Sequence, residues 1–194
     1  MTKVFVNYMT GDEENVAAML DEHLSDRFDS KVFFRASKSI PYGDDFRPAL
    51  LEAVRASDAL LAVIGARWLA DAEDGRRRID REDNWTRREI VEAFDHGVRV
   101  IPVLVGSAGA LTAEVLPPEL ARLAYCQYAR LGHRNLAGDL DLLAAKLKEL
   151  VPGLTEKERS AEGAHVVNNA HGNAKIGIQG VVHGDPSFDF GGKP

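Results

Sequence analysis

The stretch ALLAVI, Ala59–Ile64, decides the fold of this chain. It is an unbroken apolar run without the alternation of a half-exposed strand, and it predicts a β-strand that is buried on both faces. Residues 98–105, VRVIPVLV, repeat this character further along the chain. Pro102 lies inside the second run, and because proline donates no ladder hydrogen bond we expect an edge position or a bulge there. Two such strands predict a parallel sheet that helices cover on both faces.

The segments around these two strands alternate between strand-like and helix-like patterns. Further strands are expected at 4–6, 31–34 and 125–128, and helices at 12–28, 46–57, 84–94 and 136–150. Five strands interleaved with helices predict a flavodoxin-like α/β fold with a five-stranded parallel sheet. Such sheets bind ligands beyond the carboxyl ends of their strands.

Composition narrows the class of protein. With 194 residues, 45% hydrophobic and 28% charged, the chain fits one soluble domain with an appendage. A net charge of -6 argues against nucleic-acid binding, and the basic run at 76–78 is flanked by acidic residues, which indicates a solvated loop. The sequence has no membrane-length apolar run and no signal-peptide pattern, so we expect a cytoplasmic protein. The single cysteine, Cys126, is expected to be a buried strand thiol.

Three regions are expected: a domain at 1–150, a linker at 151–163 and a low-complexity tail at 164–194. The tail is nearly uncharged and rich in Gly, Asn, Gln and Val, so it cannot build a core of its own. It is expected to be largely disordered as a single chain. Short amide-rich and β-branched stretches of this kind can also stack as in-register strands.

The helix NWTRREIVEAF, residues 84–94, holds the strongest candidate site. At about 100° per residue, Ile90, Val91 and Phe94 form its apolar stripe, and Trp85 and Glu89 project from the opposite side. An aromatic ring beside a carboxylate away from the core is typical of a small-molecule site. The alternative is that Glu89 is an ordinary solvated helix residue.

Five motifs occur together in order: VFVNY, SKSIPYGDDF at 37–46, ALLAVIGARWL at 59–69, WTRREIVEAF at 85–94 and VIPVLV at 100–105. Together they resemble a TIR domain of the bacterial type. The resemblance covers residues 3 to about 150 and implies a flavodoxin-like fold. It also implies that the turn with Ile40, Pro41 and Gly43 is the BB loop, through which TIR protomers commonly self-associate.

Many TIR domains cleave NAD, using a glutamate four residues after a tryptophan. The resemblance thus implies that Glu89 is catalytic and that Trp85 binds substrate, with Tyr8, Phe33 and Phe34 expected to line the pocket. The two phenylalanines can equally be core residues. NAD would be the substrate, no cofactor is expected, and the histidines show no metal-ligand spacing. The product would be ADP-ribose or a cyclic form.

The sequence also departs from the family pattern. Asn7 stands where the family often has serine, Arg35 where an aspartate is common, and Met9 where many members carry a phosphate-contacting arginine. Two other functions remain open. One is a non-enzymatic TIR module that acts only by homotypic docking, and the other, less favoured, is a nucleotide-sugar deoxyribosyltransferase of similar fold.

The tail segment GNAKIGIQGVVHGD, 172–185, is similar to bacterial amyloid signalling motifs and to RHIM segments. The residues that carry this resemblance are Ile176, Ile178, Gln179, Gly180, Val181 and Val182. It implies a partner receptor with a like motif, whose binding would stack the tails and bring TIR domains together.

Overall fold

Five parallel strands form one sheet in the computed structural model, which describes residues 3–29, 32–35 and 45–157. The strands are β1 Val4–Asn7, β2 Phe33–Phe34, β3 Ala59–Ile64, β4 Arg99–Val105 and β5 Ala129–Leu131. The helices are α1 Glu14–Arg27, α3 Phe46–Arg55, α4 Trp85–Asp95 and α5 Leu136–Leu150, with 3₁₀ turns η1 Arg78–Asp80, η2 Ala113–Val115 and η3 Pro118–Tyr125. The strand order β2-β1-β3-β4-β5 is the flavodoxin-like order, so the expected fold class is confirmed.

The decisive strand β3 lies between β1 and β4, and every one of its residues is buried, as its apolar run predicts. Pro102 is not at a sheet edge. It lies in β4 opposite Ala62 of β3, and β5 pairs with β4 only from Val103 onward. The proline therefore interrupts no pairing with β5.

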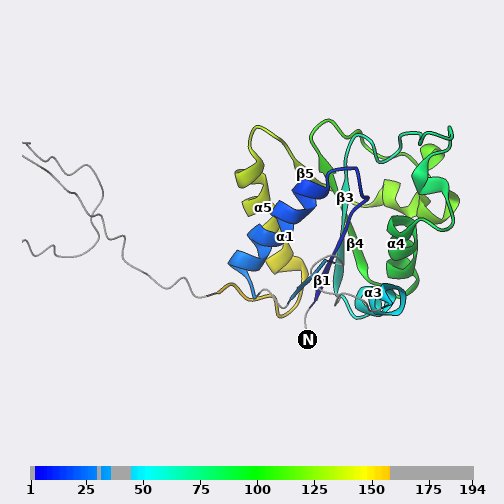
Figure 1. Ribbon diagram of the computed structural model, residues 1–194. Coiled ribbons are helices and arrows are strands. Elements are labelled where there is room, and N and C mark those ends of the chain that lie inside the picture. The colour runs from blue at the N-terminus through cyan, green and yellow to red at the C-terminus, as the bar shows by residue number, and fades with distance from the viewer. Residues whose placement is uncertain (1–2, 30–31, 36–44, 158–194) are drawn as a thin grey trace, which may run out of the picture. The chain divides into compact units, whose positions relative to one another are not determined.

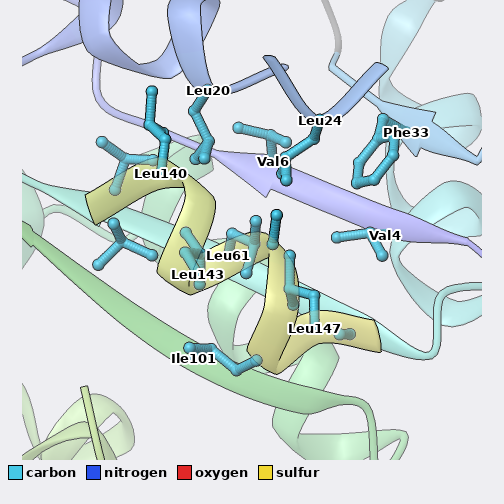
Figure 2. Close-up of a cluster of buried hydrophobic side chains, with 14 of the residues drawn as sticks. Val4, Val6, Leu20, Leu24, Phe33, Leu61, Ile101, Leu140, Leu143 and Leu147 are labelled. Carbon is cyan, nitrogen blue, oxygen red and sulfur yellow. The ribbon is translucent and has the colours of Figure 1, made fainter. Parts of the chain in front are cut away.

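Helices cover both faces of the sheet, with α1 and α5 on one side and α3 and α4 on the other (Figure 1). Successive strand residues point to opposite faces. Val4 and Val6 accordingly pack with Leu20, Leu24 and Leu143 on the side of α1 and α5 (Figure 2). Phe5 faces the other way and packs with Leu50 and Ile90 of α3 and α4.

The expected last strand at 125–128 is wrong. Leu120 and Leu123, three residues apart, bury one side of η3, and this helix runs on to Tyr125, whose side chain is 81% exposed. The strand follows it at Ala129–Leu131. Cys126 is therefore not a strand thiol. It is half-buried at the end of η3, and burial raises the pKa of its thiol.

Packing continues past α5 into the range expected to be a linker. Val151 and Leu154 are buried, and the backbone of Glu156 pairs with that of Phe28 in an isolated antiparallel β-bridge. Within the described ranges, no helix is long and apolar enough to cross a membrane. The BB-loop residues Ile40, Pro41 and Gly43 lie outside the described residues. So do the tail residues Ile176, Ile178, Gln179, Gly180, Val181 and Val182.

Candidate functional site

Helix α4 begins at Trp85 because the side chain of Asn84 caps it, accepting a hydrogen bond from the Arg87 amide at 2.9 Å. Its buried residues are Thr86, Glu89, Ile90 and Ala93. These positions follow the i, i+3, i+4, i+7 spacing of one helix face. The expectation that Glu89 projects away from the core is therefore wrong, and this residue is only 7% exposed.

Asn7, the last residue of β1, is the reason that a carboxyl group is tolerated on this face. Its amide nitrogen Nδ2 donates to Glu89 Oε2 at 2.6 Å and to the Thr86 carbonyl at 3.1 Å. Both protons of the amide are thereby used, which fixes the orientation of the side chain. Asn7 is 1% exposed, and its hydrogen bond to Glu89 joins the end of strand β1 to helix α4 inside the protein.

Burial raises the pKa of Glu89 to about 8, and the hydrogen bond from Asn7 offsets only part of this effect. The charged form is disfavoured because the carboxylate loses its water on burial. Without a ligand, most Glu89 side chains therefore hold a proton at neutral pH. A strongly shifted carboxyl at the edge of a cleft is typical of a functional site.

Glu89 borders a cleft of about 390 Å³ beyond the carboxyl end of β1. Trp85 stands beside it, half-buried, with Phe46 edge-on at 5.2 Å and the Arg88 guanidinium 5.2 Å from its ring centre. The other lining residues are Phe5, Val6, Tyr8, Thr10, Leu50, Arg78, Arg81, Asp83, Asn84 and Thr86. The site thus occupies the carboxyl edge where flavodoxin-like sheets bind ligands.

Three of the five residues expected at the pocket line this cleft, namely Glu89, Trp85 and Tyr8. Phe33 does not. It is buried in the core on the side of α1 and α5, against Phe28. Phe34 stacks on Phe5 at 5.3 Å and so lies behind a lining residue. Phe33 is thus a core residue, which was the alternative that the sequence left open, and Phe34 is partly buried against the core cluster on the side of α3 and α4.

Sequence reasoning missed Arg78 and Arg81, because the basic run before α4 looked like a solvated loop. Ile79, directly after that run, is fully buried and anchors η1 in the core. This apolar residue among charged neighbours was the sequence signal that could have shown that the segment packs against the core. No group of three or more His, Cys, Asp or Glu side chains within the described part of the chain is placed to hold a metal ion.

Comparison with known families then gives the identity of the fold. Residues 4–141 match the model of the TIR domain. The chain belongs to the TIR-domain family. A comparison with curated proteins finds no match.

One solved structure, at a TM-score above 0.5, supports the fold. The TIR domains of the activated Roq1 resistosome, which directly recognises the pathogen effector XopQ, superpose with a TM-score of 0.57 at 13% identity, covering 76% of this chain and 99% of theirs. A TIR-STING receptor from C. gigas in complex with 2′,3′-cGAMP has 17% identity, a TM-score of 0.47 and coverage of 73% of this chain and 39% of that one. TIR domains are often NAD-cleaving enzymes and self-associate.

Proposed function

We propose that this TIR protein is an NAD glycohydrolase in which Glu89 is the catalytic carboxylate and Trp85 a wall of the substrate site. The observation that carries the proposal is the buried Glu89, held by Asn7 at the edge of a cleft that also presents an aromatic ring. The family often has this activity, which supports the proposal. The product is ADP-ribose or a cyclic form.

The chemistry fits a lone carboxylate. The bond between ribose C1′ and the nicotinamide nitrogen breaks, and its electron pair leaves with nicotinamide, which departs neutral and needs no acid. Positive charge is left on the ribose, and an ionised Glu89 stabilises it. Water then adds to C1′ and loses a proton, giving ADP-ribose, or a nucleophile of the adenine closes the ring in its place.

The proton on Glu89 must leave before this step. A cationic nicotinamide ribose in the cleft favours the charged carboxylate and lowers its pKa, since an opposite charge within a few ångströms stabilises the ionised form. Substrate binding would therefore help to ionise the catalytic group. This coupling accounts for a buried carboxyl group that is mostly neutral when the cleft is empty.

We further propose that self-association through the loop with Ile40, Pro41 and Gly43 activates the enzyme, and that a receptor with a like tail motif triggers it in immune or cell-death signalling. The second candidate function is a non-enzymatic interaction module. The arrangement around Trp85 favours it, because Phe46 and Arg88 contact this ring.

Nicotinamide release from NAD separates the two functions. Glu89→Gln removes the charge while keeping the shape, so turnover should fall roughly a hundredfold or more, as on loss of one preorganised electrostatic group. Asp95→Asn is the matched control, since it makes the same carboxyl-to-amide change at an exposed position of α4. Full turnover by a folded Glu89→Gln protein, or none by the wild type at high concentration, rejects the enzyme.

A further inference from the structure

Arg78 lines the cleft without an ion pair to any carboxylate that the structure describes. Three nearby arginines form ion pairs. Arg77 binds Asp80 through two nitrogens, at 2.7 and 2.8 Å, Arg81 binds Asp74 at 2.6 Å, and Arg87 binds Glu119 at 3.0 Å.

The backbone and side chain of Arg78 are both held in place. Ile79 is fully buried next to it, and the Arg77–Asp80 ion pair closes the same 3₁₀ turn. One guanidinium nitrogen, Nη1, donates to the carbonyl of Thr10. A guanidinium carries five N–H donors, so most of them remain for a ligand.

The segment after β1 places this cation near Glu89. The Thr10 carbonyl accepts from Arg78, and the Tyr8 carbonyl accepts from Thr86 Oγ1 at 3.1 Å, on the same helix turn as Glu89. Two residues of chain span at most about 7 Å. The arginine and the helix that carries the carboxyl group are therefore tied to one short stretch of backbone.

We propose that Arg78 binds the phosphate attached to the nicotinamide ribose, an inference that rests on the proposed function of the cleft. With ribose C1′ at Glu89, the 5′-phosphate of the same nucleotide lies one ribose ring away. A guanidinium fork matches phosphate oxygens in geometry and charge. Met9 cannot serve instead, because it is 2% exposed in the core. Arg81 also lines the cleft, but its guanidinium already forms an ion pair with Asp74.

Two ligands that differ only in the phosphate isolate this contact. In the full-length Glu89→Gln protein, whose turnover should be strongly reduced, calorimetry measures binding of nicotinamide mononucleotide and of nicotinamide riboside. Adding Arg78→Gln should weaken the mononucleotide roughly tenfold or more, as expected for loss of a hydrogen-bonded charge, and leave the riboside unchanged. Arg78→Lys keeps the charge without the fork and should recover part of the affinity.

Arg76→Gln is the matched control, since Arg76 is exposed and does not line the cleft. The inference is overturned if Arg78→Gln weakens both ligands equally, or if Arg76→Gln weakens the mononucleotide as much as Arg78→Gln does. In that case, nicotinamide release by the wild type would still uphold the proposed function. Conversely, ADP-ribose binding that depends on Arg78 in a protein that never releases nicotinamide upholds the phosphate site and rejects the enzyme. If none of these ligands binds, both fall.

Discussion

Burial holds the pKa of Glu89 at about 8 in the folded protein, against 4.5 for the free side chain. Between about pH 4.5 and 8 the folded state keeps a proton that the unfolded chain has lost. The free energy of unfolding should therefore fall as the pH rises through this window, by up to a few kcal/mol, and stay level above it. Urea denaturation across the pH range should show this fall in the wild type. Glu89→Gln should lack it, and parallel curves for the two proteins would contradict the expectation.

A substitution of Asn7 tests the same pKa shift, because its hydrogen bond to Glu89 is the contact that lowers the pKa of Glu89. Asn7→Leu removes it and should extend the fall in stability to higher pH. The acid limb of the NAD-cleavage profile should move in the same direction. A merely structural role for Asn7 would lower stability equally at all pH values.

The sequence allowed the Trp85 and Glu89 pair to be found, but not the burial of Glu89. A prediction from helical periodicity treats glutamate as a polar residue and assigns it to the solvent-facing side of the helix. The partner that makes burial tolerable, Asn7, lies 82 residues away in the chain. Only the fold brings the end of β1 against α4, so no local pattern could reveal this contact.

Among the elements, the turn between β1 and α1 has an anchor of its own. The buried carboxylate of Asp12 accepts from the Gly65 amide at 2.9 Å and the Arg67 amide at 3.0 Å, which ties this turn to the end of β3. Asp12→Ala leaves both amides without this acceptor and should lower the free energy of unfolding by about 2–4 kcal/mol.

Gly65→Ala tests the same anchor from the other side. A methyl group there would lie 2.4 Å from Asp12 Oδ1 and 2.3 Å from Glu13 Cγ, so the carboxylate must move. The two substitutions should therefore cost less together than the sum of their separate costs. Strict additivity in urea denaturation would show that the methyl group displaces something other than Asp12.

Elements with a strong pattern were predictable. The buried runs of β3 and β4 and the helices α1 and α5 were all found, because burial there depends on the chain's own apolar residues. Strand β5 was misplaced because Tyr125 and Tyr128 favour a strand by composition. The structure leaves both rings exposed and ends a 3₁₀ helix at Tyr125 instead.

For the whole molecule, we expect activity to depend on assembly. If protomers complete one another's sites through the loop with Pro41 and Gly43, specific activity should rise with protein concentration and be nearly absent in dilute monomer. Deleting 164–194 should remove the activation by a tail-bearing receptor but spare cleavage at high concentration, since the TIR domain remains. Constant specific activity from dilute to concentrated protein, or an unaffected Gly43→Pro variant, would contradict assembly.

The two tryptophans differ sharply in surroundings. Trp68 is fully buried, whereas Trp85 is half-buried at the cleft beside Arg88. Collisional quenchers such as iodide should therefore extinguish the emission of one indole and spare the other. The accessible fraction of the ultraviolet fluorescence becomes an optical signal for whether the cleft is empty or filled, without any attached dye.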